Sequence, residues 1–210
     1  MIIHDVPQGS DCWFSLRLGR PTASSFDKII TPTGKASTQA DAYANMLVAE
    51  WLTGQPGGME PNAWMQRGTD MEPEARSFYE MDADAEVEQV GFLTRDDGWV
   101  GCSPDGLVGG DGLLEIKCPS PAVHVEYLLN AEIPGKYKPQ VQGQLLIAER
   151  DWCDFLSYHP DMPPVRIRVE RDEAFIKALS GRLDALVEAI QDKRERLTKR
   201  GIEPTYAAAA

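Results

Sequence analysis

Two short segments constrain the fold of this chain most strongly, because each places charged residues inside sequence that otherwise has the character of β-strand. They are Ser103-Pro104-Asp105-Gly106 and Glu115-Ile116-Lys117, and apolar residues flank both. Between them, Gly109-Gly110-Asp111-Gly112 is a strong turn signal. The simplest arrangement is therefore two antiparallel strands joined by a hairpin.

The alternation of side chains along a strand decides which of these residues meet. Glu115 and Lys117 share one face of the second strand, while Ile116 points to the other. The turn can fold Asp105 back toward Glu115. Two carboxylates that converge on one ammonium group are costly unless a divalent cation binds them and the Lys faces an anion. This is the arrangement that a metal-dependent phosphodiesterase needs.

These residues alone leave open a non-functional alternative, in which Asp105 is a solvated turn residue and Glu115 and Lys117 lie on an exposed strand face. A calcium loop of the EF-hand type that starts at Asp105 is excluded, because Leu107 and Gly109 occupy its third and fifth positions, where the loop needs oxygen ligands. The strand over 113–118 is very hydrophobic for a surface strand, and charges in such strands usually have partners.

The two segments resemble the PD-(D/E)xK signature of the YqaJ viral recombinase family, a group of phage lambda exonuclease-like nucleases. Three further blocks resemble this family and follow its order along the chain. They are Trp13 to Gly19 with Thr22 to Ser24, Arg67 to Arg76, and Gln140 to Gln142.

The resemblance implies a metal centre. Asp105 and Glu115 would be its carboxylate ligands, with the main-chain carbonyl of Ile116 completing the shell and Glu72 as a further acidic ligand. Lys117 would place the attacking water and offset charge in the transition state. Hard oxygen ligands without a thiolate suit Mg²⁺, for which Mn²⁺ can substitute.

Further site residues follow from the resemblance. Gln140 would touch the active-site water or phosphate, and Arg17 with Ser24 and Ser103 would hold the 5′-phosphate of the degraded strand. Each has a simpler interpretation, as a solvated helix face, a surface Arg, or cap and turn hydroxyls. Glu72 also fits a capping box, although Pro73 disfavours helical geometry at Glu72. We expect the helix over 73–81.

The net charge of −12 argues against nucleic-acid binding, which depends on Lys and Arg. Charge placement answers this, because acidity concentrates over 72–88 and basic residues form an N-terminal and a C-terminal set. These sets are Arg17, Arg20, Lys28 and Lys35, and Lys193, Arg194, Arg196, Lys199 and Arg200. The resemblance implies a ring-shaped homotrimer that threads duplex DNA.

The predicted fold class is α/β (α+β), a restriction-endonuclease-like core whose central mixed β-sheet is flanked by helices, with an N-terminal helical extension. Helices are expected over 22–30, 39–52, 73–81 and 122–130, after Pro139, and from Phe175 to Ile190; strands over 87–95, 99–103, 113–118, 152–158 and 165–169. Residues 1–206 would form a single exonuclease domain, followed by a frayed tail over 207–210.

No long apolar run or basic leader occurs, so we expect no membrane span and no secretory signal. We also expect reduced cysteines and, from the resemblance, a phage or prophage protein in the bacterial host cytoplasm.

The implied activity is a Mg²⁺-dependent 5′→3′ exonuclease that degrades one strand of linear double-stranded DNA. It would leave a 3′ single strand for a single-strand annealing protein. A structure-selective or site-specific endonuclease with the same core is the nearest alternative. A non-catalytic DNA-end-binding module would be marked by loss of Asp105, Glu115 or Lys117, and all three are present.

Overall fold

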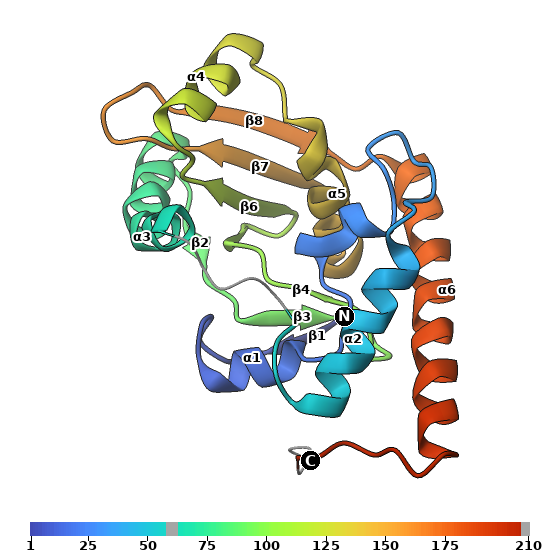
Figure 1. Ribbon diagram of the computed structural model, residues 1–210. Coiled ribbons are helices and arrows are strands. Elements are labelled where there is room, and N and C mark those ends of the chain that lie inside the picture. Colours follow the sequence, from blue (N-terminus) through green and yellow to red (C-terminus); the bar gives the residue numbers. More distant parts are fainter. Residues whose placement is uncertain (58–62, 207–210) are drawn as a thin grey trace.

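The computed structural model describes residues 1–57 and 63–206, with side chains omitted for 63–65, and the predicted tail over 207–210 lies outside the described residues. A mixed five-stranded sheet of order β2-β5-β6-β7-β8 forms the centre (Figure 1). Only the β6–β7 pair is parallel. The strands are β2 (Val87–Glu88), β5 (Gly106–Val108), β6 (Gly112–Lys117), β7 (Trp152–Ser157) and β8 (Val165–Glu170).

A smaller antiparallel sheet of order β1-β3-β4 lies beside it. Its strands are β1 (Ile2–His4), β3 (Phe92–Thr94) and β4 (Gly101–Cys102). The single strand predicted over 87–95 is therefore wrong, because β2 and β3 belong to different sheets. The predicted hairpin at the turn over 109–112 is confirmed, with β5 as the partner of β6, whereas the strand predicted over 99–103 corresponds to β4, which pairs with β3. The chain passes from one sheet to the other at 103–105.

Helices cover both faces of the large sheet and confirm the predicted fold class. They are α1 (Asp11–Arg17), α2 (Ala40–Thr53), α3 (Ala63–Ala83), α4 (Pro121–Asn130), α5 (Lys138–Ala148) and α6 (Glu173–Thr198), with 3₁₀ turns η1 (Ala23–Lys28) and η2 (Gly135–Tyr137). The turn η1 replaces the α-helix predicted over 22–30. The connection through α4, η2 and α5 joins the parallel strands β6 and β7, as parallel pairing requires.

Each sheet face has its own hydrophobic cluster. Leu113 and Phe155 pack with η1, α2, α5 and α6, whereas Leu114 and Ile116 pack with α3. The helix α5 approaches η1 closely at Gly143, where an added Cβ would lie 2.3 Å from the ring of Phe26. A glycine at this point therefore lets α5 lie against the centre of the fold, next to β6.

The helix α3 begins before Pro73, which contradicts the predicted start at that residue. Proline inside a helix removes one hydrogen bond and costs roughly 3 kcal/mol. Burial of Ala75 and Tyr79 against the sheet offsets this cost. Glu72 therefore lies within the helix and is not its cap.

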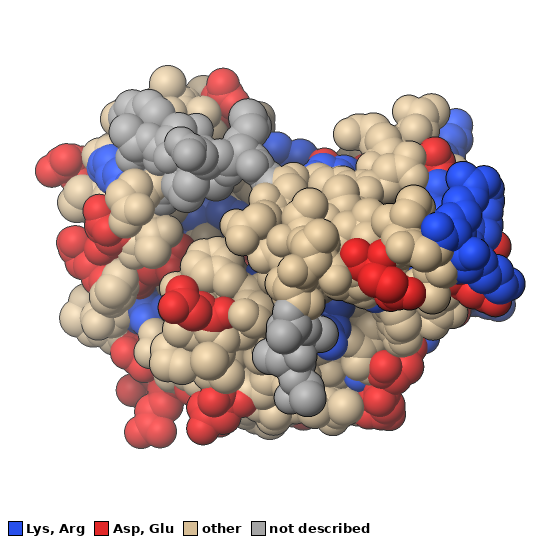
Figure 2. Space-filling view, turned by 60° about the horizontal axis from the view of Figure 1, so that its bottom comes forward, with Lys and Arg blue, Asp and Glu red and all other residues tan. Residues whose placement is uncertain are grey.

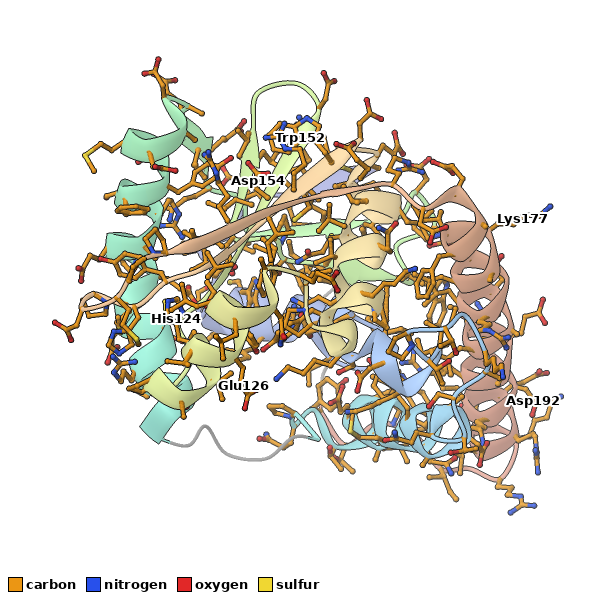
Figure 3. The ribbon with its side chains drawn as sticks, turned by 90° about the horizontal axis from the view of Figure 1, so that it is seen from above. His124, Glu126, Trp152, Asp154, Lys177 and Asp192 are labelled. Atoms are coloured by element: carbon orange, nitrogen blue, oxygen red, sulfur yellow. The ribbon has the colours of Figure 1, made fainter. Side chains whose placement is uncertain are left out.

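Asp154 on β7 is buried near Trp152 at one side of the sheet (Figure 3). It accepts hydrogen bonds from Arg168 Nε and Nη2, each 2.8 Å long, and from the Tyr79 hydroxyl at 2.8 Å. Burial opposes ionisation, but the hydrogen bonds from Arg168 and Tyr79 outweigh it and lower the pKa of Asp154.

Asp154→Asn is therefore expected to lower the free energy of unfolding by about 2 kcal/mol at pH 7, since charged hydrogen bonds are lost. A carboxyl group whose pKa is lowered on folding stabilises the folded state at pH values above its ordinary pKa. This stabilisation is lost as the pH falls through the lowered pKa. The difference between variant and wild type, measured by urea titration, should thus shrink below about pH 3.9. An equal difference at pH 7 and in strong acid would contradict this account.

All four cysteines are free thiols. Within the described part of the chain, no helix combines the length and hydrophobicity needed to cross a bilayer.

Candidate active site

Asp105 lies at the crossing between the two sheets, directly before β5. Its backbone N–H donates to the Leu114 carbonyl at 3.1 Å, and its Oδ2 accepts from the Ile116 N–H at 2.6 Å. Arg76 Nε donates to the Asp105 carbonyl at 3.3 Å. These contacts fix the carboxylate of Asp105 against β6, beside Glu115.

Glu115 is buried, with 2% of its surface exposed, and its carboxylate accepts hydrogen bonds from three side-chain nitrogens of the described residues. Oε1 accepts from Lys117 Nζ and from Gln140 Nε2, the latter at 2.5 Å. Oε2 accepts from Gln144 Nε2 at 2.6 Å. The Lys117 ammonium also lies 5.2 Å from the centre of the Tyr137 ring, a cation–π distance.

The charges of this cluster perturb one another. Burial, and next the charge of Glu115, raise the pKa of Asp105 well above its ordinary value. Burial also raises the pKa of Glu72, against the opposing effect of the Lys117 charge. For Lys117 burial lowers the pKa, but the Glu115 and Asp105 charges outweigh it and the net shift is upward. For Asp105, the repulsion from the Glu115 carboxylate is thus larger than the attraction of the Lys117 ammonium group.

The residues present fit a divalent metal ion. Asp105 and Glu115 offer hard carboxylate oxygens, and Oε1 of Gln144 is a further buried oxygen with no hydrogen-bond donor. Glu72 interacts electrostatically with Asp105 but stands apart from it: among the described residues, no three His, Cys, Asp or Glu side chains form a ready metal-ligand cluster. Ile116 contributes its N–H to Asp105, and its side chain is buried on the opposite sheet face.

Arg17 is the last residue of α1, and its guanidinium contacts the other two residues predicted to bind the 5′-phosphate, Ser24 and Ser103. Its Nη1 lies 3.4 Å from the Ser103 hydroxyl and its Nη2 lies 3.5 Å from the Ser24 hydroxyl. The guanidinium stacks over the ring of Trp13 at 4.2 Å, four residues earlier on the same helix. Trp13 Nε1 in turn donates to Ser103 at 2.9 Å. Burial lowers the pKa of Arg17.

One cavity of about 170 Å³ joins the two sets of residues. Its walls include Arg17, Ser24 and Ser103 at one side, and Asp105, Glu115, Lys117, Gln140 and Gln144 at the other. Of the predicted site residues, Glu72 and Ile116 do not line this cavity. Residues from α1, η1, the sheet crossing, β6 and α5 thus meet around a space of the size of a phosphate group and a few waters.

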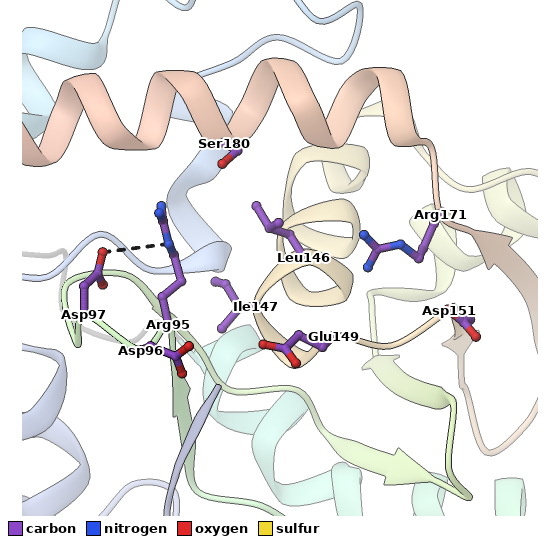
Figure 4. Close-up of a pocket in the computed structure, with 9 residues that line it drawn as sticks. All are labelled: Arg95, Asp96, Asp97, Leu146, Ile147, Glu149, Asp151, Arg171 and Ser180. Atoms are coloured by element: carbon purple, nitrogen blue, oxygen red, sulfur yellow. Dashed lines mark ion pairs between the residues drawn. The ribbon is translucent and has the colours of Figure 1, made fainter.

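A larger cavity of about 660 Å³ lies elsewhere, between α5, α6 and the loop after β3 (Figure 4). Its cations already have acidic partners: Arg95 pairs with Asp184 at 2.7 Å and with Asp97 at 3.9 Å, and Arg171 pairs with Glu173 at 2.6 Å. It holds no convergent set of unpaired charges, so the smaller cavity is the candidate active site.

Several residues in or beside the cavity were not assigned from the sequence, among them Gln144, Trp13 and Tyr137. Gln144 lies one turn after Gln140 on α5, and this spacing is the signal that could have found it. Trp13 precedes Arg17 by one turn of α1, a spacing that favours contact between the two side chains. Tyr137 carries no sequence signal, because its ring reaches Lys117 only through the tertiary fold.

Of the two sets of basic residues predicted near the N-terminus and the C-terminus, only Arg17 lines the candidate active site. Arg17 lines the cavity, whereas Arg20 donates to the Gly98 carbonyl at 2.9 Å and lines a different cavity. Near the C-terminus, Lys193 pairs with Asp41 at 2.9 Å. Figure 2 shows acidic residues scattered over one face, with a compact group of Lys and Arg at its right edge.

The profile of the YqaJ-like viral recombinase domain matches residues 12–151, which include every residue that lines the cavity except Gln8. The chain belongs to this family. No curated protein sequence matches it.

Solved structures of exonucleases are similar to most of the chain. An alkaline exonuclease, LHK-Exo, from Laribacter hongkongensis is 36% identical with a TM-score of 0.83, over 91% of this chain and 98% of that one. LHK-Exo in complex with dAMP matches at 34% identity and a TM-score of 0.82, with the same coverage. A phage-related exonuclease from Haemophilus somnus 129PT, 16% identical over 85% of this chain and 96% of that one, shares the fold with a TM-score of 0.68.

Proposed function

We propose that this protein is a Mg²⁺-dependent exonuclease that degrades one strand of linear double-stranded DNA in the 5′→3′ direction. Nuclease activity of the exonuclease type is supported by membership of the viral recombinase family and by similarity to the alkaline exonuclease LHK-Exo. The observation that carries the finer proposal is that the Arg17 cluster and the Asp105–Glu115–Lys117 cluster line one cavity.

Each residue has a role that its contacts support. Asp105 and Glu115 would hold the divalent ion together with the Ile116 carbonyl, and Glu72 would add an acidic group from α3. Lys117 would hold the attacking water and offset the charge that develops on the phosphoryl oxygens. Gln140, whose amide already touches Glu115, would orient the water or the phosphate. When bound, Mg²⁺ or a substituting Mn²⁺ stabilises charge on the attacking and leaving oxygens.

The 5′ polarity depends on Arg17. A guanidinium flanked by the hydroxyls of Ser24 and Ser103 presents donors on one side, which suits the oxygens of a terminal phosphate monoester. Stacking on Trp13 holds the guanidinium plane in place. A strand bound by its 5′-phosphate here would place its terminal phosphodiester near Lys117, since both residues line the same small cavity.

Arg17→Ala is expected to reduce the preference for 5′-phosphorylated over 5′-hydroxyl duplex by about 10–100-fold, the worth of a charged hydrogen bond. The measurement is kcat/KM on both substrates. Arg20→Ala is the control, because Arg20 lies three residues away and outside the cavity. If the Arg17 variant keeps its preference, the phosphate pocket lies elsewhere.

The direct test of the proposed activity is a time course on linear duplex labelled at the 5′ end or at the 3′ end, with Mg²⁺ and with a chelator. Early release of the 5′ label as mononucleotide, late release of the 3′ label, and no release in the chelator are expected. Early loss of the 3′ label would overturn the polarity. Cleavage of covalently closed circular DNA would instead favour the structure-selective or site-specific endonuclease, since an exonuclease has no end to attack.

The biological setting belongs to the same proposal. Residues 1–206 would act as one exonuclease domain in a homotrimeric ring around duplex DNA, in the cytoplasm of a bacterial host. The 3′ single strand would pass to a single-strand annealing protein. A ring would retain DNA by enclosure, which suits a chain whose net charge is −12.

A further inference from the structure

Gln144 and Gln140 hold opposite oxygens of the same carboxylate. Both lie on α5, four residues apart, so their side chains point to the same side of the helix. Gln140 Nε2 contacts Oε1 of Glu115, which Lys117 also contacts, whereas Gln144 Nε2 contacts Oε2 and is its sole recorded partner in the described part of the chain.

The two carboxylate oxygens also differ in depth. Lys117 is 25% exposed and Gln140 is half-buried, while Gln144 is only 1% exposed. Oε1 therefore faces the accessible part of the cavity, and Oε2 faces its floor. The Gln144 amide is already buried and hydrogen-bonded, so binding of an ion in the cavity removes no further water from it.

The charge of Glu115 fixes which way the Gln144 amide points. Turning it over would bring its oxygen to within 2.6 Å of Oε2, where two acceptors would face each other. Gln144 lines the cavity, and in the observed orientation its amide oxygen is buried and has no donor from the described residues. It is thus free to accept from a water there.

We propose that Gln144 is a positioning residue that clamps Oε2 of Glu115, so that Oε1 is presented to the divalent ion. On binding of the ion, Lys117 and Gln140 leave Oε1 and turn toward water and phosphate, while the Gln144 hydrogen bond persists. The inference rests on the proposed metal-dependent activity. It assigns the two neighbouring glutamines different tasks, one mobile and one fixed.

The chain supplies a matched control in Gln142. This residue is on the same helix and equally buried, at 2% exposure, but its amide joins the Glu170 carbonyl at 2.8 Å and the Asp172 N–H at 2.8 Å. Gln142→Met and Gln144→Met remove the same chemistry from the same helix. Only the second change removes a hydrogen bond from the Glu115 carboxylate.

The test is Mn²⁺ affinity of the full chain, measured by electron paramagnetic resonance without DNA. Gln144→Met should weaken Mn²⁺ binding by about 10-fold or more, as loss of a residue that orients a ligand does. The Mg²⁺ concentration for half-maximal rate should rise by the same factor. Gln142→Met should lower the melting temperature and leave Mn²⁺ affinity unchanged. Unaltered affinity in folded Gln144→Met, or equal loss in both variants, overturns the proposal.

Two further measurements keep the outcomes distinct. Asp105→Asn in the same assay tests the proposed function: if wild type binds Mn²⁺ no better than this variant, both the function and the clamp are rejected. Should Gln144→Met not fold, NMR of the wild type decides. Mg²⁺ should shift the side-chain amide signal of Gln140 while the Gln144 amide protons stay protected from exchange, and faster exchange of the Gln144 amide overturns the clamp.

Discussion

Lys117→Ala is expected to lower the rate of DNA hydrolysis by about 10³-fold, while DNA affinity stays within about threefold of wild type. The reason is that the ammonium acts on charge that develops during the reaction, whereas ground-state binding uses many other contacts. Without the ion, the Glu115 and Asp105 charges outweigh the lowering effect of burial and raise the pKa of Lys117. Single-turnover rates at saturating Mg²⁺, with affinity measured in Ca²⁺, separate the two effects.

Lys136→Ala is the matched control for Lys117. Lys136 lies 4.8 Å from the same Tyr137 ring that Lys117 approaches at 5.2 Å, but it does not line the cavity. Its replacement should leave the single-turnover rate within about twofold of wild type. Unchanged hydrolysis by the Lys117 variant would refute the catalytic role.

Asp105→Asn should lower turnover by about 10³-fold as well, because one carboxylate ligand is lost. Its effect on stability should be the opposite. The side-chain oxygen of Asn can still accept from the Ile116 N–H, and the repulsion from Glu115 disappears. In a chelator at pH 8 the variant should therefore melt at the same temperature as wild type or higher, and Mg²⁺ should raise the melting temperature of wild type alone.

The pH dependence of wild type follows from the raised pKa of Asp105. A carboxyl whose pKa rises on folding contributes stability below its ordinary pKa, and this is lost as pH rises through the raised value. Without divalent ions, wild type should thus lose stability relative to Asp105→Asn between acid and neutral pH. Asp111→Asn, at an exposed position in the β5–β6 turn, is the control and should follow wild type. Identical pH profiles for all three would contradict the account.

The hairpin and the shared face of Glu115 and Lys117 could be predicted because both depend on local patterns, a turn and a period of two. The same reasoning misplaced the strand before Asp105. Pairing partners are set by the tertiary fold, and the chain changes sheets at 103–105 without a sequence signal. Asp105 still meets β6, since its backbone and carboxylate both bond there.

The Arg17 pocket illustrates the other limit of local reasoning. Arg17 and Ser103 are separated by 86 positions, and only the family resemblance predicted that they share one pocket. Gln144 was missed for a similar reason, because its spacing from Gln140 places the two amides on one helix face but does not show that this face is buried. Glu72 was placed at a helix start on the strength of Pro73, whereas burial of Ala75 and Tyr79 extends the helix past it.

The central claim is that Asp105 and Glu115 bind one divalent ion beside Lys117. Anomalous diffraction from crystals soaked in Mn²⁺ tests it most directly. The account predicts a single strong peak, or a close pair, in contact with both carboxylates and the Ile116 carbonyl, with the Gln144 amide still on Oε2 of Glu115. A Mn²⁺ peak bound to other residues, with none between these two carboxylates, would contradict it.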